Sequence, residues 1–225
     1  MLDIRFVDTP ALALAKAKDV TNKMAEEVYE SLKIAMNLVE VYDEEAANKV
    51  VEMEENVDRY EDGLNSYLLK SSSKDLSEKD SHNVTVMLHC INDFERISDH
   101  SVNIMASAKE MYEKEAEFSN KAQEELAVFT KSIVDILEAS VKVFCEENLE
   151  LAKKIEPMEE CIDYLSEEMK KRHVKRLRKG KCTIEMGFVL SDITTNYERV
   201  SDHCSNIAIC LLQLNEEGFD THEYQ

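Results

Sequence analysis

The sequence predicts an all-α protein built from two tandem three-helix bundles. The chain has 225 residues but only four Gly and two Pro, so residues that break helices are scarce. Apolar residues recur at spacings of three and four along six long segments, which is the period of an amphipathic helix. Motifs of the first half return in the second half. Long helices with short connections pack as antiparallel bundles, and a hydrophobic content of 44% is sufficient for their cores.

The first repeat is expected to span residues 10–112. Its first helix runs from about residue 10 to 42, with Thr9 as N-cap and Pro10 as a tolerated first-turn residue. A second helix follows, and a run of Ser at 71–73 marks the loop before a third helix over about 76–112. The apolar seam of the second helix is an unbroken heptad pattern made of Ala46, Val50, Met53, Val57, Tyr60, Leu64 and Tyr67.

The second repeat is expected over residues 118–214. A helix over about 118–144 is followed by one whose pattern contains Pro157, which should kink that helix or reset its start. A basic stretch ending at Gly180 closes this helix, and the last helix covers about 183–214. Residues 1–9 are a lead-in, and residues 215–225 are predicted to form a loose tail. The seam of the helix with Pro157 consists of Leu151, Ile155, Met158, Ile162, Leu165 and Met169.

The two halves match residue by residue. Residues 93–104 read DFERISDHSVNI and residues 196–207 read NYERVSDHCSNI, with seven of twelve positions identical at an offset of 103. MEENVD at 53–58 returns as MEECID at 158–163, at an offset of 105. An internal duplication explains both matches.

Acidic residues of the repeated motifs fall on particular helix faces. At about 100° per residue, Glu95 and Asp99 lie opposite the apolar seam of their helix, and Glu198 and Asp202 do the same in the second repeat. The second helix of each repeat carries three acids on one flank. These acids are Glu55, Asp58 and Asp62 in the first repeat and Glu160, Asp163 and Glu167 in the second. A three-helix bundle would place the two rows of each repeat side by side.

Bound cations would account for such rows. Two uncompensated carboxylates at i,i+4 destabilise a helix by a few tenths of a kcal/mol, and facing rows add to this. Oxygen-only ligands suit Mg, Ca, Mn or Fe better than Zn. The alternative is a solvated acidic face with local salt bridges, in which Arg96 and Arg199 give partial neutralisation. His100 and His203 follow the repeated aspartates but point about 100° away. We therefore expect them to pack against, or hydrogen-bond to, a neighbouring helix.

Composition excludes several classes of function. A net charge of −20 repels nucleic acid and anionic lipid, and it repels free phosphate unless bound cations reverse the local sign. The six Cys show no CxxC spacing, and neither a signal peptide nor an apolar run near 18 residues is found, which predicts a cytoplasmic protein with reduced thiols. Catalysis is not expected, because the chain has no phosphate-binding Gly-rich loop and no nucleophile–base set. Di-iron oxidases use Glu-x-x-His pairs that face a bundle core, and the repeated acids do not form such pairs.

ERISDH and ERVSDH, each in a duplicated three-helix unit, resemble the ERIGDH-type signature of PhoU proteins. The ExxxD motif of that family corresponds to Glu95…Asp99 and Glu198…Asp202, with Ser98 and Ser201 in place of the usual glycine. The resemblance covers residues 10–214. It implies two symmetric bundles with multinuclear metal clusters, commonly iron, on their surface. It also implies a part in phosphate homeostasis through contacts with other proteins. Whether phosphate binds through the bound metal stays open.

A narrower resemblance concerns residues 2–20. LDIRFVDTPALALAKAKDV is similar to the junction at which the PhoU-like tail of bacterial sodium/phosphate cotransporters leaves the membrane part. This resemblance implies a regulatory domain of a sodium-dependent phosphate transporter, placed at the inner face of the cell membrane. The alternatives are a stand-alone PhoU-type regulator, or a helical adaptor without functional metal that docks through apolar positions such as Val84 and Val102. Homo-oligomerisation stays open.

Overall fold

The computed structural model describes residues 6, 9–72 and 76–220, with the backbone alone for Pro10 and residues 215–220. Within these ranges the chain forms helices and no strand, which confirms the all-α prediction. The helices are α1 (Pro10–Glu40), α2 (Glu44–Ser72), α3 (Glu78–Glu113), α4 (Asn120–Glu146), α5 (Leu149–Ala152), α6 (Ile155–Arg178) and α7 (Ile184–Asp220).

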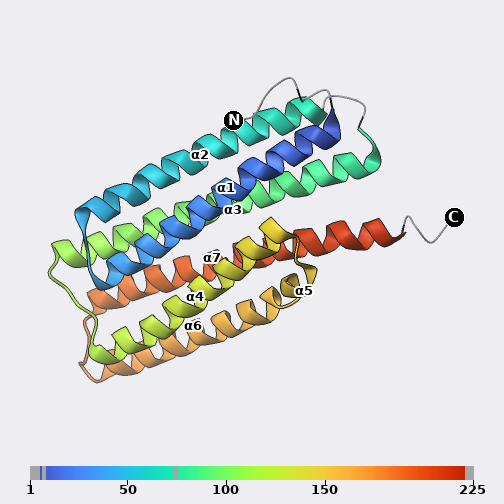
Figure 1. Ribbon diagram of the computed structural model, residues 1–225. Helices are drawn as coiled ribbons and strands as arrows, with labels where there is room; N and C mark the ends of the chain where they lie inside the picture. The colour runs from blue at the N-terminus through green and yellow to red at the C-terminus, as the bar shows by residue number, and fades with distance from the viewer. Residues whose placement is uncertain (1–5, 7–8, 73–75, 221–225) are drawn as a thin grey trace.

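The helices form two three-helix bundles. Helices α1, α2 and α3 pack on one another, as do α4, α6 and α7. Figure 1 shows the first bundle above the second, joined along α3 and α7. Helices α3 and α7 pack closely together, and α1 also contacts α4, so these two pairs form the interface between the repeats. The predicted architecture of two tandem bundles is confirmed.

Local sequence signals set the helix ends. Thr9 is the N-cap of α1 and Pro10 occupies its first turn, as predicted. The hydroxyl of Ser77 accepts a hydrogen bond from the Asp80 amide at 3.1 Å and so caps α3. Pro157 does reset its helix: the chain turns after the short α5, and α6 begins at Ile155. Pro157 then lies in the first turn of α6, where a backbone N–H has no partner within the helix.

The C-terminal helix is longer than predicted. It was expected to end at Leu214, but α7 continues to Asp220, six residues into the predicted tail. These residues include Asn and Glu, which a helix tolerates, and the single Gly218 costs only about 1 kcal/mol in a helix. Residues 221–225, the lead-in apart from Phe6 and Thr9, and Ser73 of the predicted loop lie outside the described residues.

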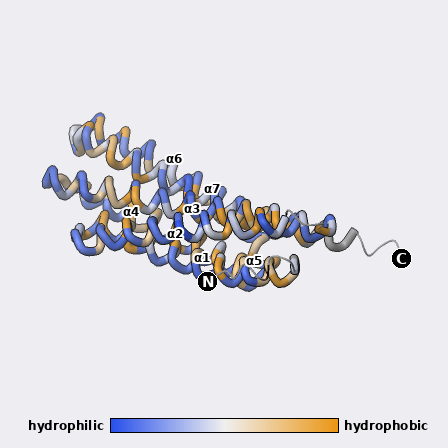
Figure 2. The backbone as a smooth tube through the Cα atoms, turned by 90° about the horizontal axis from the view of Figure 1, so that it is seen from above, coloured by the Kyte–Doolittle hydropathy of each residue, from blue (hydrophilic) through white to orange (hydrophobic). Residues whose placement is uncertain are grey.

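The aromatic residues of the duplicated motifs are buried. Phe94 of α3 packs edge-on against Phe144 of α4, across the two bundles, with ring centroids 5.2 Å apart. Its counterpart Tyr197 is fully buried beside Phe129, at 5.3 Å between centroids, and its hydroxyl lies 2.9 Å from that of Thr130. Figure 2 shows hydrophilic and hydrophobic stretches alternating along the helices. None of the described helices is both long and apolar enough to span a membrane.

Candidate functional site

Carboxylates from α2 and α3 face one another along the first bundle. Burial and the nearby Asp99 raise the pKa of Glu95 to about 7, and Glu61 and Asp58 of α2 act in the same direction. Burial, followed by Asp58 and Asp99, also raises the pKa of Glu54. Carboxylates affect one another's pKa in this way only at short range. We call Glu54, Asp58, Glu61, Glu95 and Asp99 the first carboxylate row.

The second bundle repeats the arrangement between α6 and α7. Burial raises the pKa of Asp163, and Asp202 and Glu198 raise it further. Burial also raises the pKa of Glu159, which shares a hydrogen bond with the Asp163 side chain. We call Glu159, Asp163, Glu198 and Asp202 the second carboxylate row. Acids of neighbouring helices therefore lie close together in both bundles, as expected.

All six acids that the sequence singled out on α2 and α6 are exposed. Asp58 and Asp163 interact with acids of the neighbouring helix, so we include them in the rows. Three of the others raise the pKa only of an acid on their own helix: Glu55 acts on Glu54, Glu160 on Glu159 and Glu167 on Asp163. We place these three and Asp62 at the border of the rows. Glu54 and Glu159, which are half-buried between the helices of each pair, were not predicted from the sequence. Their signal was present, because Glu54…Asp58 and Glu159…Asp163 have the same ExxxD spacing as Glu95…Asp99.

Basic side chains neutralise part of each row. Arg96 lies 3.3 Å from Asp99 and 3.5 Å from Glu95, and Arg199 lies 3.3 Å from Asp202. Both Arg side chains are more than half exposed, at 53% and 63%, so these pairs are weak. Lys170 approaches more closely, with its Nζ 2.9 Å from both carboxylate oxygens of Glu198. The predicted local salt bridges thus exist, but they leave most of the acids of the first row without a basic partner among the described residues.

The two repeated histidines lie at the interface between the bundles. The Nδ1 of His100 is 2.8 Å from the Oδ1 of Asn196, and the Nδ1 of His203 is 2.8 Å from the Oδ1 of Asp93. Because an amide or carboxylate oxygen accepts, each imidazole donates. Asn206 also donates to Asp93, at 3.4 Å. The prediction that these histidines bond to a neighbouring helix is confirmed.

Comparisons with known proteins agree with the fold of two bundles. The family model described as the PhoU domain matches residues 21–108 and 129–211, one match in each bundle. The chain belongs to the PhoU family. The phosphate-specific transport system accessory protein PhoU homolog 1 of Thermotoga maritima is 28% identical over 199 residues, which cover 86% of this chain and 83% of that protein.

Two solved PhoU structures share the fold. The crystal structure of PhoU from Pseudomonas aeruginosa superposes with a TM-score of 0.86 at 16% identity, over 92% of this chain and 99% of that one. The phosphate transport system regulatory protein PhoU from Streptococcus pneumoniae gives a TM-score of 0.82 at 19% identity, over 93% and 98% of the two chains. The resemblance drawn from ERISDH and ERVSDH is thereby confirmed.

The serines that replace the glycine of the PhoU signature are buried. Ser98 is 1% exposed and Ser201 is fully buried. Within the described part of the chain, neither hydroxyl has a hydrogen-bond partner. Each helix therefore accommodates a Cβ and a hydroxyl at this position, and the unpaired hydroxyl offsets some of the stability gained over Gly.

The carboxylate rows of this PhoU protein have the donor chemistry of a hard-cation site. They offer oxygen atoms from two adjacent helices, and Lys170 already places one positive charge between two oxygens of Glu198. Among the described residues, no three Asp, Glu, His or Cys side chains converge closely enough to hold a metal ion as they stand. The residue types and the facing helices fit a metal, and the side-chain rotamers would have to adjust to bind one.

Proposed function

We propose that this PhoU protein is a regulator of phosphate transport whose carboxylate rows hold metal cations. The observation that carries the proposal is the facing of two carboxylate rows in both bundles, with the pKa of Glu95 raised to about 7. Like charges held close together and partly buried destabilise the fold, and a bound cation removes that cost. Metal binding would therefore stabilise this arrangement, and no catalytic step is needed to explain it.

The first row would supply ligands from Glu54, Asp58, Glu61, Glu95 and Asp99, and the second from Glu159, Asp163, Glu198 and Asp202. The exposed Glu55, Asp62, Glu160 and Glu167 add negative charge at the border. A cation bound in either row ties two helices of one bundle together. Iron is the metal that the family resemblance favours, and all-oxygen ligands also suit Mg, Ca or Mn. A bound cation supplies a local positive charge through which phosphate can bind to an otherwise acidic surface.

The partner of this regulator is, in our proposal, a membrane phosphate transporter contacted at the inner face of the membrane. The Thermotoga maritima relative is named as an accessory protein of a phosphate-specific transport system, and the match covers most of both chains. That coverage favours a stand-alone accessory regulator over the sodium/phosphate cotransporter domain suggested by residues 2–20. The gene upstream of residue 1 distinguishes the two, since membrane-spanning segments encoded there in frame would restore the cotransporter.

Metal analysis of the purified protein tests the proposal. We compare the wild type with the variant Glu95→Ala/Asp99→Ala/Glu198→Ala/Asp202→Ala. A matched control removes four exposed acids outside the rows, in the variant Glu45→Ala/Glu52→Ala/Glu124→Ala/Asp192→Ala. The wild type and the control should bind metal in equal amounts, and the row variant should lose it. Near-zero metal in all three proteins, after loading with iron, manganese and magnesium, would leave the helical adaptor as the better description.

Regulation is tested separately, in cells of the source organism that lack the gene. Phosphate uptake in phosphate-rich medium should rise in these cells and return to normal with the wild-type gene. The row variant, produced at the same level, should fail to restrain uptake, and the four-acid control should succeed. Full restraint by the row variant would show that the rows are not part of the regulatory mechanism.

A further inference from the structure

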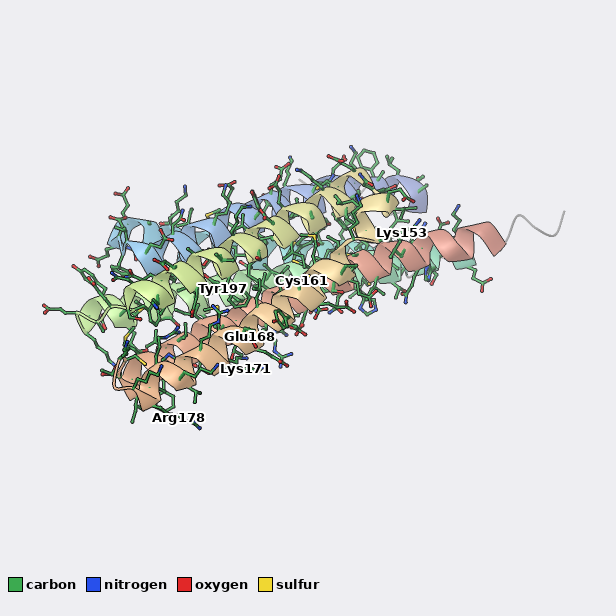
Figure 3. The ribbon with its side chains drawn as sticks, turned by 90° about the horizontal axis from the view of Figure 1, so that it is seen from below. Lys153, Cys161, Glu168, Lys171, Arg178 and Tyr197 are labelled. Carbon is green, nitrogen blue, oxygen red and sulfur yellow. The ribbon has the colours of Figure 1, made fainter. Side chains whose placement is uncertain are left out.

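One segment of this acidic chain is strongly basic. Residues 170–181 contain eight of the 27 Lys and Arg residues, in a protein of net charge −20. The segment covers the end of α6, where Figure 3 labels Lys171 and Arg178 and where the chain turns back into α7. Exposed basic residues in a last helical turn, such as Lys175 and Arg178, are explained by the helix dipole. Arg176 is not, because it is buried.

Arg176 lines a cavity of about 520 Å³ between the end of α6 and the starts of α4 and α7. Its side chain is 10% exposed, and its Nη1 donates to the Oε2 of Glu125 at 2.6 Å. Its Nε and Nη2 have no hydrogen-bond partner among the residues that the structure describes. A guanidinium keeps its charge at any physiological pH, and buried donors without partners are rare and costly. A hydrogen-bond acceptor placed against Nε and Nη2 of Arg176 would therefore be stabilising.

The charge of Arg176 is only partly balanced by Glu125. The same carboxylate also accepts from Arg172 at 3.4 Å, so two guanidinium groups share one negative charge. Lys181 adds a further positive charge at the cavity wall, and the one acid of that wall, Glu117, is exposed. Gly180 places Lys181 there, because its φ of +62° lets the chain reverse and the Lys181 amide bond to the Arg176 carbonyl at 3.0 Å.

The start of α4 points its positive end at the same cavity. Its N-cap residue Ser119 lines the cavity but makes no side-chain capping bond, and its hydroxyl is buried without a partner in the described chain. The first turn of α4 contains no acid that would compensate the dipole. Free amides at a helix N-terminus bind oxyanions. Arg176 and Ser119 thus both line one space and both carry polar atoms without a partner in the described chain, although neighbouring atoms cover these groups from the cavity itself.

We infer that this cavity binds a phosphate dianion, either inorganic phosphate or the phosphate group of a small metabolite. A rotation of the Arg176 side chain brings its Nε–Nη2 edge to two phosphate oxygens. The start of α4 and the Ser119 hydroxyl, once turned toward the cavity, bind another oxygen, and Lys181 closes the site. The volume is within the range of small-molecule sites and exceeds what a single phosphate fills. This site does not depend on metal and lies beyond the end of the second carboxylate row.

The first bundle lacks the equivalent chemistry. At the offset of 105 that relates α2 to α6, Arg176 corresponds to Ser71 and His173 to Leu68. The buried guanidinium that the site requires is thus present in one repeat only. We therefore expect one anion per chain, although the carboxylate rows occur twice.

Isothermal titration calorimetry of the full chain in EDTA tests the inference, because the chelator removes any phosphate binding through metal. Inorganic phosphate and AMP are titrated separately at low ionic strength. The wild type should bind one equivalent, and the ligand that binds more tightly identifies the source of the phosphate group. Ser119→Asp should abolish binding without loss of thermal stability, since Asp is a good N-cap that puts a negative charge in the cavity.

A pair of lysine variants controls for overall charge. Lys181→Ala should weaken binding about fivefold, the scale of one exposed ionic contact. Lys142→Ala removes the same charge from an exposed ion pair on α4 and should leave affinity unchanged. Three results would overturn the site: no heat from the wild type with either ligand at millimolar concentration, undiminished binding by Ser119→Asp, or equal effects of the two lysine variants.

Discussion

His203 of α7 donates a hydrogen bond to Asp93 of α3 across the interface between the bundles, with 2.8 Å between Nδ1 and Oδ1. The internal repeat generates its counterpart, since His100 makes the same bond to Asn196, also at 2.8 Å. Asp93 corresponds to Asn196 and His100 to His203, both at an offset of 103. The interface is therefore self-complementary, as in a two-fold symmetric dimer. The His of each SDH motif thus joins the repeats, and the neighbouring Asp belongs to a carboxylate row.

The single difference between these pairs, Asp against Asn, predicts unequal effects of removing each His. His203→Ala leaves the Asp93 side chain, 10% exposed, with the longer bond from Asn206, and should cost about 2–3 kcal/mol. His100→Ala leaves a neutral amide and should cost about 1 kcal/mol. Urea unfolding measures both. Adding Asp93→Asn to His203→Ala should recover part of the loss, and equal losses for the two His variants would contradict this account.

Glu95 should make the metal-free protein less stable as the pH rises. Burial and the facing acids raise its pKa from 4.5 to about 7 in the folded protein. The folded state then holds a proton that the unfolded state releases above pH 4.5. The contribution of Glu95 is fully present below pH 4.5 and is lost as the pH rises through 7. Glu95→Gln removes this dependence.

Thermal unfolding in EDTA at pH 5 and pH 8 tests this prediction. The gain in melting temperature of Glu95→Gln over the wild type should be larger at pH 8. Glu52→Gln, an exposed position on α2, serves as the control and should show no such trend. A gain for Glu95→Gln that is the same at both pH values would show that Glu95 titrates normally.

The residues that hold metal should be those of the rows and not their sequence neighbours. Glu54→Ala/Glu159→Ala removes the half-buried acid of each ExxxD pair, and Glu55→Ala/Glu160→Ala removes the exposed acid that follows it. Both variants lose two charges from the same repeated motif. Metal content measured after equal loading should fall in the first and stay at the wild-type level in the second. A loss of metal in the second variant and not in the first would place the ligands on the exposed flank that contains Glu55 and Glu160.

The sequence was sufficient for the architecture but not for the side on which α3 packs. Heptad seams, Pro157 and the duplicated SDH motifs determine the helices and the repeats because these signals are local. The choice between Glu54 and Glu55 is not local. Relative to the buried Val57, Glu54 is rotated about 60° and Glu55 about 160° around the helix, and only the position of α3 decides which one faces it. The burial of Arg176 could not be predicted from the sequence either. A basic helix end is normally exposed to solvent, and this one is covered only because the chain reverses at Gly180.

Two glycines in helices offer a matched test of packing. A Cβ added at Gly63 of α2 meets nothing within 4 Å, so Gly63→Ala should stabilise the protein by about 0.5–1 kcal/mol through helix propensity and a less flexible unfolded chain. A Cβ added at Gly187 of α7 would lie 2.7 Å from the Nε2 of His173, which is 8% exposed on α6. Gly187→Ala should therefore push α6 and α7 apart beside the proposed anion cavity and destabilise the protein by about 1–3 kcal/mol. Urea unfolding should give a higher free energy of unfolding than the wild type for Gly63→Ala and a lower one for Gly187→Ala. Stabilisation by both substitutions would mean that α6 and α7 do not approach as closely at Gly187 as the structure shows.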